Sequence, residues 1–335
     1  MGSSAKQKPL TQSVKDTVST QRKIQREQDS KEKAKSQKPA DKSKPAVQTG
    51  KKKQPAPPMS PNHLEKPGIE AELDLAPQFL AENYKGSGKL EGMKAIVTGG
   101  DSGIGRAVAV MFAREGADVA IVYLNEHSDA KETRRHVEAE GRQCVLLPGD
   151  VKDPAFCRKV VAKTVKTFGK LDVLVNNAAF QMHADSLIEL TEERFDETMK
   201  TNVYGYFYMA KAALPHMKRG ASIVNTGSVT GLKGSGKLLD YSATKGAIHA
   251  FTMALASNVL DKGIRVNAVA PGPVWTPLNP ADKSSPEEIE QFGAQTDYRR
   301  AAQPEEISPA YVFLASAACS SYITGIVLPI TGSVG

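Results

Sequence analysis

From Met93 onwards, short apolar runs alternate with longer stretches of helical periodicity. The apolar runs predict buried strands at Ala95–Thr98, Val119–Tyr123, Cys144–Leu147, Val173–Val175, Ile223–Thr226, Val266–Ala270 and Ile326–Leu328. The stretches between them predict helices at Gly103–Arg114, Asp129–Glu140, Ala155–Phe168, Glu192–Met217 and Tyr241–Leu260. This alternation is typical of parallel strands joined by crossover helices. We therefore expect a doubly wound α/β fold, with a seven-stranded, mostly parallel sheet and helices on both faces.

The chain before Met93 has a different character. Residues 1–60 carry 15 Lys and Arg against 5 Asp and Glu, whereas the other residues carry 29 against 32. With few large apolar side chains and no sustained apolar stripe, residues 1–60 are predicted to be a disordered basic tail. Such a tail is either merely solvated or contacts an anionic partner. Residues 61–92 are predicted to be an arm that packs on the body, and residues 93–335 a single domain.

Three cysteines, Cys144, Cys157 and Cys319, form no CxxC pair, so a disulfide framework is not expected. The six histidines show no paired metal-binding spacing, so no metal is expected. The Lys-rich start lacks the apolar core of a secretory signal, and no apolar run reaches the roughly 20 residues of a membrane span. A cytoplasmic location is the expectation.

A glycine-rich turn follows the first predicted strand. It reads Thr98-Gly-Gly-Asp-Ser-Gly-Ile-Gly105, and it opens the first predicted helix. Gly99 permits a tight turn, Gly103 lets the backbone approach a pyrophosphate, and Gly105 allows close packing of helix on strand. The helix then directs its free N–H groups at the phosphates. Within a Rossmann-like fold, this turn predicts a dinucleotide site that includes Asp101, Ser102 and Ile104.

Tyr241 and Lys245 are four residues apart on a predicted helix, so their side chains share one face. A phenol has a pKa of about 10, and burial raises it further, so a phenol needs a cation to act as a base. An ammonium about 4 Å away, at an effective dielectric constant of about 20, contributes about 4 kcal/mol, or about 3 pKa units. We therefore expect Lys245 to lower the pKa of Tyr241 and make it a proton-transfer group.

Together with Asn176-Asn-Ala178 and Ser228, these motifs resemble the short-chain dehydrogenase/reductase family over about Leu90 to Gly335. The arm Lys66-Pro-Gly-Ile-Glu70 and the ending Ile323–Gly332 resemble one subgroup in particular. That subgroup contains bacterial general stress oxidoreductases and plant proteins called glucose and ribitol dehydrogenase homologues. One departure is Ala179, where the family usually has glycine.

The resemblance implies a catalytic group in which Tyr241 is the acid or base. Lys245 would also bind the nicotinamide ribose, Ser228 would bind the substrate oxygen, and Asn202 would hold a water of the proton relay. It further implies coenzyme contacts around the nicotinamide and adenine at Asp150, Val151, Asn177, Ala178, Pro271, Gly272, Val274 and Thr276. The polar, Pro-broken segment near 275–300 is expected to be a substrate lid, and His183 either lines the substrate mouth or lies on a surface loop.

The coenzyme preference is left open by the end of the second predicted strand. An acid there commonly binds the ribose diol of NAD, but this chain has Tyr123 at that position. No Arg or Lys follows at once to attract the 2′-phosphate of NADP. Asn125 and Glu126 follow instead, and Glu126 can accept ribose hydroxyls. The expectation leans slightly to NADP and holds NAD nearly equal.

The expected activity is an NAD(P)-dependent interconversion of an alcohol and an aldehyde or ketone, with a small aldehyde, sugar or polyol as substrate. Two alternatives remain: a 3-oxoacyl thioester reductase, and a non-catalytic stress or interaction protein with a dinucleotide-sensing domain and a basic tail. The resemblance also implies a homotetramer with the helices at Glu192–Met217 and Tyr241–Leu260 in its main interface.

Overall fold

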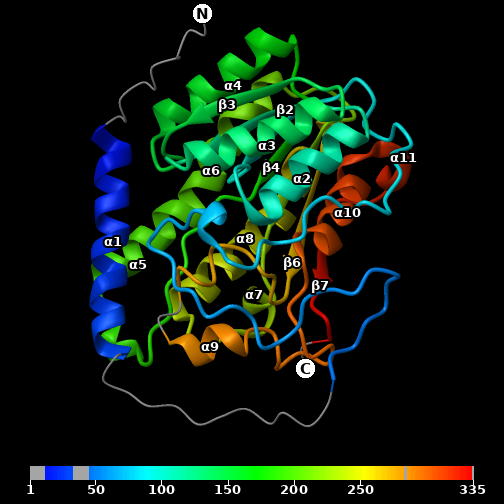
Figure 1. Ribbon diagram of the computed structural model, residues 1–335. Helices are drawn as coiled ribbons and strands as arrows, with labels where there is room; N and C mark the ends of the chain where they lie inside the picture. Colours follow the sequence, from blue (N-terminus) through cyan, green and yellow to red (C-terminus); the bar gives the residue numbers. More distant parts are fainter. Residues whose placement is uncertain (1–11, 33–44, 283–284, 334–335) are drawn as a thin grey trace, which may run out of the picture.

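The computed structural model describes residues 12–32, 45–282 and 285–333 (Figure 1). Seven strands form one sheet in the order β3-β2-β1-β4-β5-β6-β7, and every neighbouring pair is parallel. The predicted fold is confirmed, and the sheet is parallel throughout. The strands are β1 (Lys94–Thr98), β2 (Asp118–Tyr123), β3 (Cys144–Pro148), β4 (Val173–Asn176), β5 (Ser222–Thr226), β6 (Arg265–Pro271) and β7 (Val327–Ile330).

Helices cover both faces of the sheet (Figure 1). One face is buried under α2 (Gly103–Arg114), α3 (His127–Ala139) and α10 (Pro304–Ala315). The other face is buried under α4 (Pro154–Phe168), α6 (Gly205–Ala213) and α8 (Leu239–Asn258). Because both faces are covered, the strands consist mainly of apolar residues on both sides, which is why short apolar runs were sufficient to find them.

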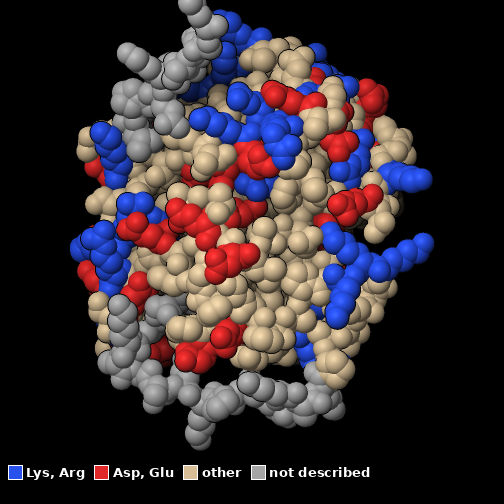
Figure 2. All heavy atoms as spheres, viewed as in Figure 1, with Lys and Arg blue, Asp and Glu red and all other residues tan. Residues whose placement is uncertain are grey.

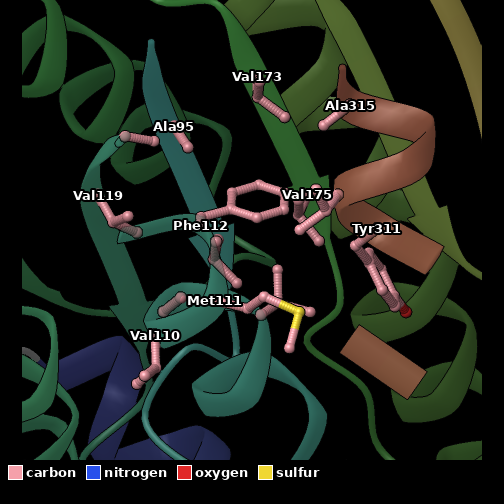
Figure 3. Packing of buried hydrophobic residues seen from close by; sticks show 14 of the residues in the cluster. Ala95, Val110, Met111, Phe112, Val119, Val173, Val175, Tyr311 and Ala315 are labelled. Carbon is pink, nitrogen blue, oxygen red and sulfur yellow. The ribbon is translucent and has the colours of Figure 1, made fainter. Parts of the chain in front are cut away.

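Packing on the first face is shown in Figure 3. Met111 and Phe112 of α2 pack in one cluster with buried residues of the strands and with Tyr311 of α10. Phe112 and Tyr311 are fully buried. The packing at the centre of this layer therefore fixes α2 against β1. The glycine-rich turn lies at the start of α2, so its position is fixed as well.

Two helical regions differ from the prediction. The stretch expected as one helix from Glu192 is divided into α5 (Glu192–Met199), a π-helical turn (Lys200–Tyr204), α6 and a 3₁₀ turn (Leu214–His216). Helix α10 was not predicted, because Pro304 and Pro309 interrupt its apparent periodicity. The remaining short helices are α7 (Thr230–Lys233), α9 (Pro286–Glu290) and α11 (Ala317–Ser320), with 3₁₀ turns at Glu70–Glu72, Leu187–Glu189 and Leu260–Lys262.

The prediction of a disordered tail is wrong for residues 12–32, which form helix α1 (Gln12–Glu32) along one side of the molecule (Figure 1). The buried face of α1 has helical spacing and consists of Val14, Thr17, Val18, Gln21, Ile24, Gln25 and Gln28. Four of these seven side chains are polar, so the face does not register as an apolar stripe. Residues 45–60 are also described, whereas 1–11 and 33–44 lie outside the described residues.

Hydrogen bonds explain how α1 buries polar side chains. Gln25 donates to the carbonyl oxygens of Leu64 (2.8 Å) and Ala281 (3.1 Å), and its own oxygen accepts the Lys66 N–H (2.8 Å). Ile24 packs with Phe180 and Met182. Because its buried amides are satisfied, α1 docks on the body without a continuous apolar face.

Part of the basic charge of α1 is neutralised by the body. Lys23 pairs with Glu193 at 3.0 Å, and Arg22 pairs with Glu65 at 3.5 Å. On the face shown in Figure 2, basic and acidic side chains are interspersed. Contact of this segment with an anionic partner remains a prediction. Within the ranges that the structure describes, we find no helix with the length and apolar character of a membrane span.

The arm packs against the segment that was expected to be a lid. Leu64 and Leu73 of the arm form a cluster with Trp275, Ala281 and Ile289. Trp275 is fully buried, and its indole N–H donates to the Leu75 carbonyl at 2.8 Å. Trp275 therefore anchors the start of this segment to the arm.

Glu70 ties the arm to the glycine-rich turn. Its carboxylate accepts the Gly103 N–H at 2.6 Å and pairs with the buried guanidinium of Arg106. Its own N–H donates to Asp129 of α3 at 2.6 Å. The first residue of α2 is thus held from outside the sheet by a carboxylate of the arm, as expected for a negative group at a helix N-terminus.

Candidate active site

A cavity of about 1010 Å³ opens at the carboxyl ends of the strands. The strand order reverses between β1 and β4, and doubly wound folds bind their ligands at such a point. The loops that follow β1 to β6 line the cavity, together with the arm, α1 and the segment after Trp275. Residues far apart in sequence therefore face one space.

The glycine-rich turn forms one wall of the cavity. Gly99 and Gly103 have positive φ angles of 61° and 49°, which glycine adopts without strain. A Cβ atom at Gly105 would lie 1.8 Å from the Gly99 carbonyl oxygen, so this position supports the turn from beneath and does not line the cavity. The N-terminus of α2 follows directly, and this combination fits the pyrophosphate of a dinucleotide.

Thr98 links this turn to the loop after β4. Its hydroxyl accepts the N–H groups of Asn177 (2.8 Å) and Ala178 (3.1 Å). The Asn177 amide donates to the Gly99 carbonyl at 3.2 Å, and its oxygen accepts the Thr226 hydroxyl at 3.2 Å. The two loops are therefore held in a fixed relation across the switch point.

Two buried acids lie at the end of the cavity formed by the loops after β1 and β2. Asp101 and Glu126 both line it beside Tyr123. Burial is the main cause that raises the pKa of Asp101 to about 6 and that of Glu126 to about 8, and the Asp101 charge contributes to the Glu126 shift. Asn125 does not line the cavity; its N–H donates to the Glu126 carboxylate at 2.8 Å.

Tyr241, Lys245 and Ser228 line the opposite part of the same cavity. Tyr241 and Lys245 lie on α8, and Ser228 follows β5. The Ser228 side chain acts on Tyr241 by lowering its pKa, although burial has the larger, opposite effect. The Lys245 ammonium donates to the Thr226 carbonyl at 2.7 Å and lies 5.3 Å from the centroid of the Tyr241 ring.

The expected lowering of the Tyr241 pKa is not observed in this structure. Tyr241 is 8% exposed and Lys245 is fully buried, and burial disfavours the charged form of each side chain. Burial raises the pKa of Tyr241 well above its usual value and lowers that of Lys245 to about 7. Desolvation is the main cause of both shifts, so Tyr241 is a neutral phenol at neutral pH.

Asn202 lies in the π-helical turn, and its side chain does not reach the cavity. Its amide oxygen accepts the Phe180 N–H (2.7 Å), and its NH₂ donates to the Phe180 carbonyl (2.9 Å) and the Thr244 hydroxyl (3.1 Å). The side chain therefore joins the loop after β4 to α8. A π turn of this kind is frequent at functional sites.

A buried polar group beyond Tyr241 was predicted only in part, because the sequence pointed to His183 but not to Gln181 or Asp282. Asp282 accepts hydrogen bonds from the Gln181 amide (2.7 Å) and the His183 N–H (2.7 Å), and it contacts the His183 ring at 2.9 Å. All three residues line the cavity. His183 is 3% exposed, so it lines the cavity and is not a surface-loop residue. The only signal in the sequence was the position of His183 shortly after Asn176-Asn-Ala178.

The structure thus brings most of the predicted site residues to one cavity. The residues that line it are Gly99, Asp101, Ser102, Gly103, Ile104, Tyr123, Glu126, Asp150, Val151, Asn177, Ala178, Ser228, Tyr241, Lys245, Pro271, Gly272, Val274 and Thr276. Gly105, Asn125 and Asn202 do not line it. Within the described part of the chain, no cluster of three His, Cys, Asp or Glu side chains could hold a metal ion.

Comparison with known proteins identifies the family. The model of a family described as enoyl-(acyl carrier protein) reductase matches residues 99–333. That match spans the glycine-rich turn from Gly99, the Tyr241 and Lys245 pair, and strands β2 to β7. The chain belongs to the short-chain dehydrogenase/reductase family.

Individual members of the family support this assignment. General stress protein 39 of Bacillus subtilis is 52% identical over 79% of this chain and 92% of its own length. NADPH-dependent aldehyde reductase 1 of Arabidopsis thaliana is 48% identical over 78% of this chain and 93% of its own. A short-chain dehydrogenase of Burkholderia cenocepacia, solved with NADP, superposes with a TM-score of 0.69 at 33% identity, over 73% of this chain and 99% of its own.

These relatives confirm the predicted family and its stress-protein subgroup. The short-chain dehydrogenase/reductase described here is an NAD(P)-dependent oxidoreductase that interconverts an alcohol and a carbonyl compound. The family match begins at Gly99, so α1 and the arm lie outside it.

Proposed function

We propose that this enzyme reduces the carbonyl group of small polar aldehydes and related sugars, and oxidises the corresponding alcohols, with Tyr241 as the proton-transfer group. The observation that carries the proposal is the single cavity shared by Tyr241, Ser228, Lys245 and the glycine-rich turn. The reduced coenzyme supplies the hydride when it is bound in that cavity. The name of the Arabidopsis relative, an aldehyde reductase, supports the same substrate class.

Each catalytic side chain has a role that its contacts support. Burial keeps Tyr241 protonated at neutral pH, which is the form that donates a proton to the carbonyl oxygen as the alcohol forms. Ser228 and Tyr241 line the same cavity, so the two hydroxyls can hold the substrate oxygen between them. Lys245 is held by the Thr226 carbonyl beside the Tyr241 ring, a position from which it would bind the nicotinamide ribose. Asn202 positions α8 against the loop after β4.

The polar lining beyond Tyr241 supports a hydroxylated substrate. Gln181, His183 and Asp282 present an amide, an imidazole and a carboxylate within one buried group. Substrate hydroxyls can both donate to and accept from such groups, whereas a plain alkyl chain can do neither. The segment near 275–300 supplies Asp282, and it closes this end as the substrate lid.

Steady-state turnover of the full-length protein tests this function. We expect reduction of at least one member of a panel of small aldehydes and sugars, and oxidation of the matching alcohols or polyols, followed by the absorbance of the reduced nicotinamide. A 3-oxoacyl thioester serves as the comparison substrate, and faster reduction of that thioester would favour the alternative reductase activity. Coenzyme binding without turnover of any panel member would instead contradict a catalytic role.

Glu126 gives a pH-dependent test of coenzyme preference. Its pKa is raised to about 8, so at neutral pH it is mostly a neutral acid that can donate to the 2′-phosphate of NADP. As the pH rises through that value Glu126 ionises, and the carboxylate repels the phosphate but accepts ribose hydroxyls. We expect the NADP-to-NAD affinity ratio to fall roughly tenfold between about one pH unit below and about one unit above the Glu126 pKa.

Glu126→Gln is the control for this prediction, because glutamine stays neutral and can still donate. Fluorescence titration of both reduced coenzymes measures the ratio at each pH. For Glu126→Gln the ratio should change much less with pH. A wild-type ratio that is constant across the range would contradict this role of Glu126.

A homotetramer is supported by apolar side chains on the outer faces of α6, α8 and the adjoining turns. Phe207, Tyr204, Met253 and Leu260 are 43%, 45%, 49% and 60% exposed. Such a set is typical of an interface between copies. Light scattering measures the mass in solution, and a monomer would contradict this part of the proposal.

A further inference from the structure

Helix α1 reaches the cavity, although it lies outside the matched family region. Thr17 and Gln21, one helical turn apart, line the cavity together with Asp150, Val151 and Thr201. Thr17 is 5% exposed and Gln21 is 5% exposed, so both are enclosed between α1 and the body. A residue from the start of the chain thus borders the space formed by the loop after β3.

The contacts of Thr17 are specific. Its hydroxyl donates to the Asp150 carboxylate, whose other oxygen accepts the Lys152 N–H at 2.8 Å. Lys152 in turn donates to Glu197 at 2.6 Å, and Glu197 accepts the Gln21 amide at 3.1 Å. Two side chains of α1 therefore close a hydrogen-bonded ring with the Asp150 loop and α5.

This ring leaves the cavity open beside Asp150. Thr17 and Gln21 form part of the cavity wall here. Asp150 and Val151 line the same space, so the two α1 side chains do not fill the cavity. Asp150 has further lone pairs beyond those used by Thr17 and Lys152. The carboxylate can therefore accept another hydrogen bond while Thr17 holds its orientation.

We infer that α1 is part of the coenzyme site: Thr17 orients Asp150 to bind the adenine amino group, and Thr17 and Gln21 wall the adenine end of the cavity. This inference rests on the proposed function, which places adenine at Asp150 and Val151. It gives the N-terminal helix a role in coenzyme affinity. The effect of α1 on affinity should therefore be seen with any ligand that contains the adenine half of the coenzyme, and not with one that contains only the nicotinamide half.

The test is Thr17→Val in the full-length protein. Valine keeps the shape and β-branching of threonine but removes the hydroxyl donor. Calorimetric titration with ADP-ribose and with the reduced coenzyme should show about fivefold weaker binding of both, as expected for the loss of one hydrogen bond. The specificity constant with reduced nicotinamide mononucleotide, which lacks adenosine, should be unchanged.

Two matched variants separate this role from general damage to the helix. Thr17→Ser restores the hydroxyl and should restore most of the affinity for ADP-ribose. Thr20→Val makes the same substitution at a half-buried position of α1 that does not line the cavity, and it should bind ADP-ribose as the wild type does. Melting temperatures without ligand show whether each variant is folded.

Two results would overturn the inference. One is wild-type or tighter affinity of Thr17→Val for ADP-ribose. The other is a specificity constant with reduced nicotinamide mononucleotide that falls as much in Thr17→Val as the affinity for ADP-ribose does. Failure of the proposed function is a different observation, because the wild-type protein itself would then turn over no member of the substrate panel, whatever the affinity of Thr17→Val for ADP-ribose.

Discussion

Replacing Tyr241 with phenylalanine should lower kcat for carbonyl reduction by about a thousandfold, within the range of general acid catalysis. The phenol is buried in the cavity, and its raised pKa keeps it protonated as the acid of the reaction. Phenylalanine preserves the ring that packs against the Lys245 ammonium, so the fold and the coenzyme affinity should change little. Stopped-flow turnover and coenzyme titration of the same preparation measure both quantities.

Tyr322→Phe is the matched control, because Tyr322 is fully exposed and the substitution also removes one hydroxyl. Its turnover should equal that of the wild type. If Tyr241→Phe retained most of its activity, Tyr241 would have no role in proton transfer. Loss of coenzyme binding together with loss of turnover would show instead that the phenol holds the coenzyme.

Replacing Gly105 with alanine should weaken coenzyme binding by about 100-fold, equivalent to ~3 kcal/mol. The added methyl group would lie 1.8 Å from the Gly99 carbonyl oxygen and 2.8 Å from the Asn177 amide nitrogen. Neither atom can yield easily, because Gly99 is in the turn and the Asn177 side-chain amide is held by the Gly99 carbonyl and the Thr226 hydroxyl. The turn must therefore move away from the position in which it receives the pyrophosphate.

Gly246→Ala is the control for this substitution. An added methyl group there meets only the Gly231 carbonyl oxygen at 3.7 Å, and alanine is a better helix former than glycine. Coenzyme affinity should be unchanged, with a melting temperature equal to or above that of the wild type. Coenzyme binding by Gly105→Ala within threefold of wild type, with the fold intact by circular dichroism, would show that the turn does not hold the pyrophosphate.

The sheet was predictable because its strands are apolar on both faces. Each of the seven apolar runs became a strand, with boundaries that differ by at most two residues. The glycine-rich turn and the Tyr241 and Lys245 pair were predictable because each depends on local spacing. Helix α10 was not predictable, because two prolines interrupt its sequence. Its burial against α2 stabilises it as a helix all the same.

Helix α1 could not be predicted because its buried face is mostly amide and hydroxyl. Gln21 and Gln25 are stabilised by partners far away in sequence, at Glu197 and Ala281. Composition alone places such residues in solvent. The same limit applies to the pKa of Tyr241. The sequence shows the charge of Lys245 one helical turn away, but it does not show that both side chains are buried.

His183 and Asp282 show a further limit. They are 99 residues apart, and only the packing of the arm on the segment after Trp275 brings Asp282 to the loop that follows β4. The chain segments outside the sheet, α1 with the arm and the segment after Trp275, thus pack on one another and complete the lining of the cavity. Their positions depend on long-range contacts that no local pattern indicates.

Hydride transfer within this cavity is most directly tested by isotope labelling. The wild-type enzyme is mixed with reduced coenzyme carrying deuterium at the transferable position and with the best aldehyde of the panel, and the product alcohol is analysed by mass spectrometry. We predict one deuterium on the carbinol carbon for each coenzyme oxidised in the wild type, and no labelled alcohol from Tyr241→Phe on the same timescale. Oxidation of the coenzyme without label in the alcohol would contradict the proposed reaction, and label transfer by the variant at the wild-type rate would contradict the role of Tyr241.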